Sequence, residues 1–446
     1  MKYHLITLGC QMNLSDSGRL SAVLNDAGFE FVENEEEAQV LGILACSVRQ
    51  KAIDKVYSRI AKWNKRKNNS NLITFISGCI LSADKEKFLK LFDFVFQMSE
   101  VAKLPDMINQ YGVTSQASVL NARMDADINQ FWNIKPQYDS DFEAFVPIQN
   151  GCDKFCTFCA VPYTRGREIS RPSAEIIREV NNLVEKGYKS ITLLGQNVNS
   201  YGLDKKGDEI SFSELLRQIG EMGEERKHEF WVYFTSPHPR DMTDDVIDVI
   251  AQYKCLAKQI HLPLQSGDDK VLIRMNRKHN LSKFRNILTK IKTTIPQATI
   301  FTDIIIGFTG ETEDQFENTI QAFGEFKFNM AYIAKYSPRP GAASSRWEDD
   351  VPDEIKKKRF ARLTENLQSH VFEYNKNLIG ETLKVLVLGN GRKDGFLTGL
   401  TEGKINIRFQ SKNELLIGKF CDIKVTSNAA FSLEGELHHS KSEILV

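Results

Sequence analysis

Two runs of alternating strand-like and helix-like segments constrain the fold of this 446-residue chain more than any other feature. In the first run, hydrophobic patterning predicts strands at 3–8, 40–45, 72–77 and 92–96. A helix is predicted at 15–27, opened by Ser15 and closed by Gly28, and a second helix follows the strand at 40–45 and runs to about residue 65. In the second run, it predicts strands at 144–149, 190–194, 230–235, 259–263, 299–306 and 330–336, with helices between them. Strands that alternate with helices form parallel sheets. The sequence therefore predicts a parallel α/β domain over residues 1–102 and a partial (β/α)₆ barrel over residues 141–376.

The rest of the chain has a different pattern. Residues 103–140 lack clear periodicity and are predicted to be a linker, whereas residues 377–441 contain short alternating runs at 383–388, 405–409 and 420–425, which predict a small β-barrel. The chain enters a strand at once and has no apolar run long enough to cross a bilayer, so we expect a cytoplasmic protein without a signal peptide or a membrane partner.

Charge is balanced, with 58 basic and 58 acidic residues, which excludes a protein coated in positive charge. Two local basic segments remain, at 62–67 and 356–362. Each is either a binding face for an anionic partner or an ordinary solvated helix face.

Three of the eight cysteines form a close cluster, Cys152-x₃-Cys156-x₂-Cys159, just past the first strand of the predicted barrel. Structural zinc needs four ligands, but the next histidine in the sequence is His238. Thiolates are the usual ligands of iron–sulfur clusters, and a cubane normally takes four of them. Three ligands leave one iron open, so the spacing predicts a reactive cluster rather than a structural one.

Three other cysteines, Cys10, Cys46 and Cys79, each follow one of the first three predicted strands. The carboxyl ends of parallel strands lie along one edge of a sheet, where ligands bind. We therefore expect these thiols to converge, although three buried, inert cysteines are the alternative. Cys255 and Cys421 have no partners at useful spacing and are expected to be packing residues.

The loop that carries Cys152, Cys156 and Cys159 resembles that of the radical S-adenosylmethionine (SAM) superfamily. This resemblance implies that the three cysteines are catalytic and hold a 4Fe–4S cluster whose open iron is chelated by SAM. It also implies cleavage of SAM to a 5′-deoxyadenosyl radical.

Segments 8–13, 46–49 and 78–79 resemble the amino-terminal domain of the methylthiotransferases, in which three cysteines hold a second 4Fe–4S cluster. The residues of this chain that match those three cysteines are Cys10, Cys46 and Cys79. Segments 159–166 and 195–202 resemble the tRNA-modifying branch, and the terminal β-barrel resembles a TRAM domain, which binds RNA. The chain departs from the family at Leu44-Ala45, where Asn-Thr is usual.

The resemblance implies an enzyme that adds a methylthio group to C2 of N6-isopentenyladenosine beside the tRNA anticodon. Its implied partners are the anticodon stem-loop, SAM, and unidentified electron and sulfur donors, and we expect a monomer. Lys62, Lys65, Arg66 and Lys67 are candidates for RNA contact because phosphate contacts dominate affinity. The alternatives are N6-threonylcarbamoyladenosine in tRNA, a ribosomal protein residue, or a non-catalytic iron–sulfur RNA-binding protein.

Further candidates for binding SAM stand where barrel strands end: Gln196, Asn197, His261, Gln265, Gly307 and Arg339. Gly307 opens a turn whose backbone N–H groups could face a polar ligand. A tight strand–helix turn is the alternative for this glycine, and structural roles are the alternative for the others.

Overall fold

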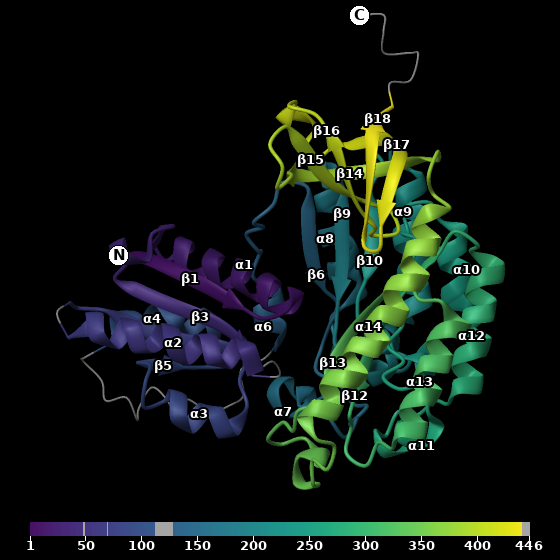
Figure 1. Ribbon diagram of the computed structural model, residues 1–446. Helices are drawn as coiled ribbons and strands as arrows, with labels where there is room; N and C mark the ends of the chain where they lie inside the picture. The colour runs from purple at the N-terminus through teal and green to yellow at the C-terminus, as the bar shows by residue number, and fades with distance from the viewer. Residues whose placement is uncertain (48–49, 69, 112–127, 439–446) are drawn as a thin grey trace, which may run out of the picture. The chain divides into compact units, whose positions relative to one another are not determined.

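The computed structural model describes residues 1–47, 50–68, 70–111 and 128–438 (Figure 1). The chain packs as two compact units. The amino-terminal unit consists of Met1–Ser140, Phe145–Arg171 and Arg339–Ser345. The carboxy-terminal unit consists of Asp141–Ala144, Pro172–Pro338 and Arg346–Val446.

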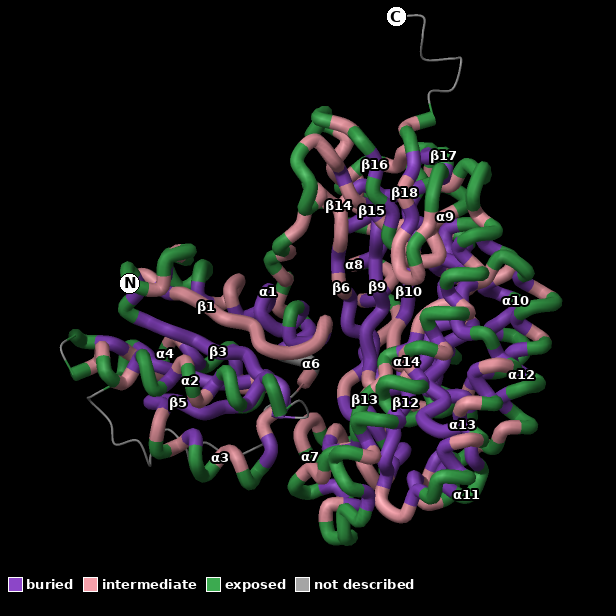
Figure 2. The backbone as a smooth tube through the Cα atoms, viewed as in Figure 1, coloured by how far each residue is buried: buried purple, intermediate pink, exposed green. Residues whose placement is uncertain are grey.

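A parallel sheet forms the centre of the amino-terminal unit, with the strand order β2-β1-β3-β4-β5. Its strands are β1 (Lys2–Leu8), β2 (Glu30–Phe31), β3 (Val40–Cys46), β4 (Ile73–Cys79) and β5 (Phe94–Val95). The central strand β3 is buried along its whole length, as its purple tube in Figure 2 shows. A strand covered on both faces is a continuous apolar run, and β3 has such a sequence, Val-Leu-Gly-Ile-Leu-Ala-Cys.

Helices cover both faces of this sheet: α1 (Gln11–Asp26), α2 (Gln50–Lys67), α3 (Ser82–Phe88), α4 (Leu104–Asn109) and α6 (Ile128–Asn133). On one face, Leu20 of α1, Leu104 of α4 and Trp132 of α6 share a core with Leu44 of β3. On the other face, α2 and α3 pack against the alternate residues of β3, such as Ile43. The predicted α/β domain is thus a three-layer structure.

The structure corrects two expectations in this unit. Helix α1 begins at Gln11 after Cys10, which occupies the N-cap position, rather than at Ser15. Helix α4 ends at Asn109 and helix α6 begins at Ile128, and buried side chains such as Ile108 and Phe131 join the core. Short helices have too few turns to show a period, so the sequence pattern suggested a linker there. Residues 112–127 themselves lie outside the described part of the chain.

Two three-stranded sheets of the partial barrel have the orders β10-β9-β6 and β11-β12-β13. The strands are β6 (Glu143–Pro147), β9 (Ser190–Leu194), β10 (Trp231–Phe234), β11 (Gln259–His261), β12 (Thr299–Ile306) and β13 (Met330–Lys335). A parallel bridge links Val232 of β10 to Leu256, three residues before β11, and so connects the two sheets. The helices are α8 (Ser173–Glu185), α9 (Phe212–Glu224), α10 (Asp244–Gln252), α11 (Asp269–Arg274), α12 (Leu281–Thr294) and α13 (Glu313–Phe326).

Helix α14 (Asp353–Lys376) leads into a closed barrel with the strand order β14-β15-β16-β18-β17. Its strands are β14 (Thr382–Asn390), β15 (Phe396–Thr401), β16 (Asn406–Gln410), β17 (Phe420–Ala429) and β18 (Ser432–Leu437). Alternate residues such as Val385, Leu397 and Phe409 fill its core. Closure removes sheet edges, which explains how so small a barrel is stable.

No helix in the described ranges has the length and apolar character needed to span a membrane.

Candidate functional site

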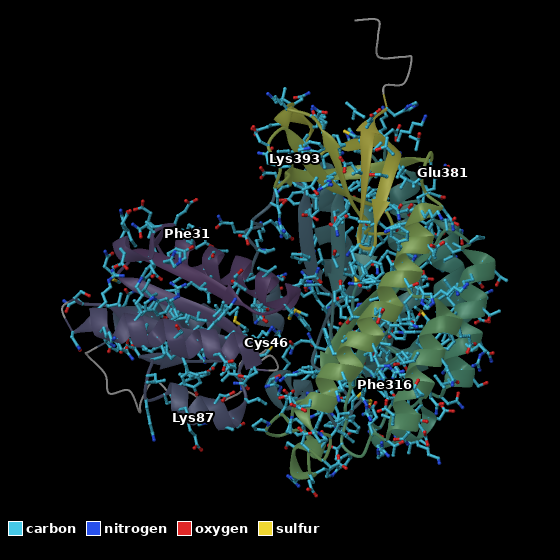
Figure 3. The ribbon with its side chains drawn as sticks, in the orientation of Figure 1. Phe31, Cys46, Lys87, Phe316, Glu381 and Lys393 are labelled. Carbon is cyan, nitrogen blue, oxygen red and sulfur yellow. The ribbon has the colours of Figure 1, made fainter. Side chains whose placement is uncertain are left out.

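The three strand-end cysteines lie at one edge of the amino-terminal sheet. Cys46 and Cys79 are the last residues of β3 and β4 and are direct register partners; Figure 3 labels Cys46 at the end of its strand. Cys10 follows β1, whose last residue Leu8 is paired with Ala45 of β3. The structure thus places the three cysteines at the carboxyl edge of the same sheet, with Cys46 and Cys79 side by side, and the convergence of all three thiols on one cluster stays a prediction.

Asn13 ties these three strand ends together. Its side-chain oxygen accepts a hydrogen bond from the Cys10 backbone N–H (3.3 Å), and its amide nitrogen donates to the Ala45 carbonyl (3.3 Å). Gly78, with φ +107°, packs closely against both residues: an added Cβ would stand 2.4 Å from the Ala45 oxygen and 2.8 Å from Asn13 Nδ2. Only glycine fits this backbone conformation and this space.

A buried arginine contacts the same edge. Arg165 donates from Nε to the sulfur of Cys79 (2.9 Å), from Nη2 to Asp16 (2.6 Å) and from Nη1 to Asn150 (3.2 Å). Burial alone would lower the pKa of Arg165, but the charge of Asp16 raises it. The guanidinium is therefore a fixed positive charge beside one of the thiols.

Cys152, Cys156 and Cys159 lie in the same unit, on a loop closed by its own backbone. The strands β7 (Gln149–Asn150) and β8 (Ile169–Ser170) pair antiparallel at the base of this loop. The Cys152 N–H donates to the Gly166 carbonyl (3.3 Å), and the Cys159 N–H donates to the Cys156 carbonyl (3.0 Å). The short helix α7 (Val161–Arg165) follows Cys159 directly.

The thiols of both sets suit metal binding by their chemistry. The hydrogen bond with Cys46, followed by burial, raises the pKa of Cys79 well above its usual range, and burial raises the pKa of Cys152 to about 11. Thiols bind metals as thiolates, so binding of a metal at these cysteines would release their protons. The eight cysteines, all of them described, form no disulfide.

Within the described ranges, no three His, Cys, Asp or Glu side chains are arranged to bind a single metal ion. A cubane cluster places each cysteine thiolate on a different iron, so its ligands do not converge on one point. Two sets of three thiols therefore fit iron–sulfur clusters better than a single-ion site.

Amide side chains end the barrel strands in the carboxy-terminal unit, as the sequence predicts. Asn197 follows β9, is 1% exposed, and donates to Ser200 (2.6 Å) and Asp241 (3.2 Å). Gln265 has φ +75°, a strained conformation for a residue other than glycine. The side-chain oxygens of Gln196, Asn197 and Gln265 are buried without a hydrogen-bond donor among the described residues. These acceptors could receive hydrogen bonds from a bound ligand.

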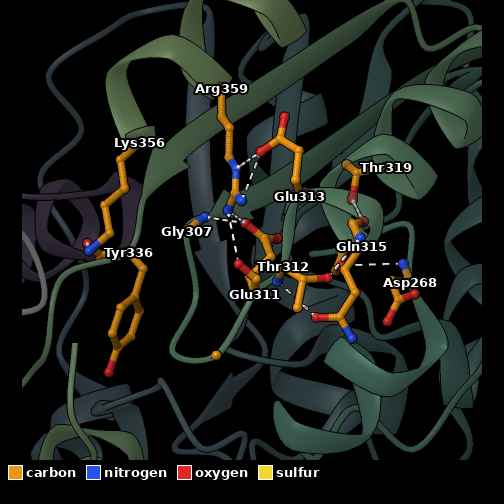
Figure 4. A network of polar contacts seen from close by, with 12 residues as sticks. Asp268, Gly307, Glu311, Thr312, Glu313, Gln315, Thr319, Tyr336, Lys356 and Arg359 are labelled. Atoms are coloured by element: carbon orange, nitrogen blue, oxygen red, sulfur yellow. Dashed lines mark hydrogen bonds and ion pairs between the residues drawn. The ribbon is translucent and has the colours of Figure 1, made fainter. Parts of the chain in front are cut away.

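His261 and Gly307 have partners within the protein. Nε2 of His261 lies 2.9 Å from a carboxylate oxygen of Asp303. The Gly307 N–H donates to the Glu311 carboxylate (2.6 Å), which also accepts from Arg359 (2.8 Å), as Figure 4 shows. The Gly307 segment is thus the tight strand–helix turn that the sequence left open as the alternative, and its first N–H is used within that turn.

Arg339 belongs to the amino-terminal unit. It donates to the Gln50 side chain at the start of α2 (2.9 Å). Burial lowers its pKa, while the nearby Cys46 acts in the opposite direction. The structure thus places Arg339 near the strand-end cysteines, a neighbour that its sequence position did not predict.

Three of the four predicted RNA-binding cations make intramolecular contacts. Lys62 pairs with Glu35 (2.7 Å), Arg66 donates to three backbone carbonyls of the loop at 35–38, and Lys67 pairs with Asp93. Lys65 is exposed. The basic helix face therefore anchors the neighbouring acidic loop, and RNA contact there stays a prediction.

Sequence reasoning missed Asn13, Asp16 and Arg165 as parts of the site. Asp16 and Asn13 are completely buried polar side chains on α1. Spacing alone could not identify them, because only the tertiary fold shows that these two polar side chains of α1 are buried. Arg165 was noted only as part of a motif, and its contact with Cys79 spans 86 residues of sequence.

Comparisons with known proteins bear on what this arrangement does. Residues 146–323 match the Radical SAM superfamily, residues 2–98 match Uncharacterized protein family UPF0004, and residues 376–438 match the TRAM domain. A protein of Haemophilus influenzae strain PittGG named tRNA-2-methylthio-N(6)-dimethylallyladenosine synthase is 38% identical over 451 residues, covering 99% of this chain and 94% of that protein. A protein of the same name from Clostridium perfringens strain SM101 is 39% identical, covering 97% of this chain and 96% of its own.

Solved structures share the fold at low sequence identity. The radical SAM methyltransferase TsrM from Kitasatospora setae, with cobalamin and a [4Fe-4S] cluster bound, has a TM-score of 0.55 at 11% identity and covers 91% of this chain and 81% of that one. The cobalamin-dependent radical enzyme OxsB has a TM-score of 0.53 at 15% identity, covering 83% of this chain and 57% of that one. These similarities show that the shared fold extends over most of this chain.

Proposed function

Since this chain belongs to the family of tRNA-2-methylthio-N(6)-dimethylallyladenosine synthases, we propose that it adds a methylthio group to C2 of N6-isopentenyladenosine beside the tRNA anticodon. One observation carries this proposal: two separate sets of three cysteines stand at a sheet edge and on a loop of the same unit. The family requires both sets, one for radical formation and one for sulfur delivery.

Cys152, Cys156 and Cys159 hold the catalytic cluster, which supplies the electron for the reductive cleavage of SAM. The protein contributes position: Cys152 and Cys156 are buried, and the loop that carries them is closed by the β7–β8 pair. The C2–H of adenine is not acidic, so a side-chain base could not activate it at neutral pH. A one-electron route through a cofactor meets this requirement.

Gln196, Asn197 and Gln265 bind SAM or the target adenosine through their side-chain oxygens. Buried acceptors without donors are costly, and the ammonium and hydroxyl groups of SAM would satisfy them. The strained backbone of Gln265 supports this role, because strained residues concentrate at binding sites. His261, whose Nε2 lies 2.9 Å from a carboxylate oxygen of Asp303, is the neighbouring candidate.

Cys10, Cys46 and Cys79 hold the auxiliary cluster, and the TRAM domain, with basic residues elsewhere, binds tRNA. The protein acts in the cytoplasm as a monomer, with separate electron and sulfur donors. The division between the two clusters follows from the two cysteine sets.

A comparison of three tRNA substrates tests the proposal. The full chain, reconstituted with iron and sulfide without oxygen, is incubated with SAM, a reductant and tRNA carrying N6-isopentenyladenosine, N6-threonylcarbamoyladenosine or unmodified adenosine at the target position. Nucleoside mass spectrometry should find a methylthio product with the first tRNA alone. Product with the threonylcarbamoyl tRNA alone would show that the substrate is wrong, and no product with any tRNA would overturn tRNA methylthiolation.

A further inference from the structure

We propose that Arg165 is a positioning residue of the auxiliary cluster, which donates a hydrogen bond to the Cys79 sulfur and thereby raises the reduction potential of that cluster. The inference deepens the proposed function, because it rests on Cys10, Cys46 and Cys79 as the cluster ligands. It concerns a residue outside both cysteine sets.

Three acceptors hold the Arg165 guanidinium in one orientation. Nη2 donates to the Asp16 carboxylate at 2.6 Å and Nη1 donates to the Asn150 side chain at 3.2 Å, which leaves Nε–H directed at Cys79 at 2.9 Å. The side chains of Arg165 and Asp16 are 7% and 0% exposed. Because a guanidinium is planar and its donors are fixed in direction, two anchored nitrogens determine where the third points.

The charges in this contact suit an anionic sulfur. A buried guanidinium is stable only with compensating partners, and Asp16 provides one of them. A neutral thiol is a weak acceptor, whereas a cluster-bound thiolate carries negative charge and accepts a charge-assisted hydrogen bond. Hydrogen bonds to cluster sulfurs are among the factors that set reduction potentials. A donor that withdraws charge from the sulfur stabilises the reduced, more negative state.

The position of Arg165 in the chain links the two cysteine sets. Arg165 is the last residue of α7, the helix that follows Cys159 directly. Its backbone carbonyl also accepts a hydrogen bond from Asn150 (3.0 Å), so both its side chain and its backbone are anchored at the base of the loop. One short segment thus carries a ligand of the radical cluster and the donor to the auxiliary cluster.

The test uses the full chain with Cys152, Cys156 and Cys159 changed to Ala, so that only the auxiliary cluster loads. Into this parent we introduce Arg165→Met, Arg165→Lys and, as a matched control, Arg178→Met, whose arginine is exposed on α8 outside the site. Iron content is measured first, and the midpoint potential is then measured by titration followed by electron paramagnetic resonance. We expect Arg165→Met to shift the potential to a more negative value, Arg165→Lys to shift it less, and Arg178→Met to match the parent.

An Arg165→Met protein with full iron and the parent's potential would overturn the inference and leave Arg165 a structural role only. If Arg165→Met fails to retain iron, Arg165→Lys decides: a more negative potential supports the inference, and the parent's potential overturns it. No tRNA is present, so failure of tRNA methylthiolation does not affect the result. A parent that binds far fewer than about four irons would contradict the ligand assignment itself, and with it this inference.

Discussion

Individual side chains at the two cysteine sets show how the protein prepares thiols for a cluster. Cys46 and Cys79 are hydrogen-bonded to each other, and Arg165 is close to the second. Cys152 is buried on its loop, and burial raises its pKa to about 11. Thiols bind metals as thiolates, so loading either set with iron would release protons.

The different positions of the two sets predict different losses of function. Cys156→Ala should abolish formation of 5′-deoxyadenosine, because it removes a ligand of the cluster that cleaves SAM. Cys46→Ala should retain part of the SAM cleavage and lose methylthio product, because the radical cluster keeps its ligands. Both products are measured by mass spectrometry after anaerobic reconstitution.

Cys421→Ala, in the terminal β-barrel, is the matched control and should retain both activities. Equal loss of SAM cleavage in Cys156→Ala and Cys46→Ala would contradict the separate roles.

The buried Glu311 carboxylate in the Gly307 turn should make the stability of the fold depend on pH. Burial raises the pKa of Glu311 from 4.5 to about 7, although Gly307 and Arg359 oppose the rise. The folded state then binds more protons than the unfolded state between pH 4.5 and 7, so this group's contribution to stability falls as pH rises through that window. The free energy of unfolding changes through this group by at most about 1.4 kcal/mol per pH unit.

Glu311→Gln removes this titration. Scanning calorimetry at several pH values should show that the melting temperature of the unmodified protein, relative to Glu311→Gln, falls from pH 5 to pH 7. A relative melting temperature that rises with pH would mean that the ion pair with Arg359 dominates over burial, contrary to this account.

At the scale of elements, Cys10, Cys46 and Cys79 lie at one edge of the sheet because the parallel strands β1, β3 and β4 share a carboxyl edge. The strand pattern was sufficient to predict this, and the strands at 190–194 and 299–306 match the predicted ranges. The chain's departure from the family at Ala45 leaves this edge intact, because Asn13 contacts the backbone carbonyl of Ala45.

The edge depends on glycine at position 78. Gly78→Ala would place a Cβ 2.4 Å from the Ala45 oxygen in a left-handed conformation, so the ends of β3 and β4 would have to separate. We expect a loss of stability greater than the roughly 1–2 kcal/mol of the conformational strain alone, and loss of iron from the auxiliary site. Denaturant unfolding and iron analysis measure the two effects.

Gly28→Ala is the matched control, since Gly28 has φ +82° with open space around it. The Gly28→Ala protein should lose only the stability that the conformational strain removes, and it should keep its iron. Equal effects of the two substitutions would mean that the close approach at Gly78 has no importance.

Over the whole molecule, the sequence was sufficient to predict the order of the three fold types along the chain, but not the contacts that form only when the chain folds. Strands β15 and β18 were not predicted, because β15 and β18 each contain a glycine within a short run, Gly399 and Gly435. Lys62 and Arg66 looked like a basic surface because the acidic loop that they contact lies about 30 positions earlier. The Arg165 contacts with Asp16 and Cys79 depend in the same way on the tertiary fold.

The most direct test of the central claim is nucleoside mass spectrometry of tRNA from cells that lack this protein. We expect loss of 2-methylthio-N6-isopentenyladenosine and accumulation of N6-isopentenyladenosine, with restoration by the intact gene but not by genes encoding Cys46→Ala or Cys156→Ala. Unchanged 2-methylthio-N6-isopentenyladenosine in those cells would contradict the claim.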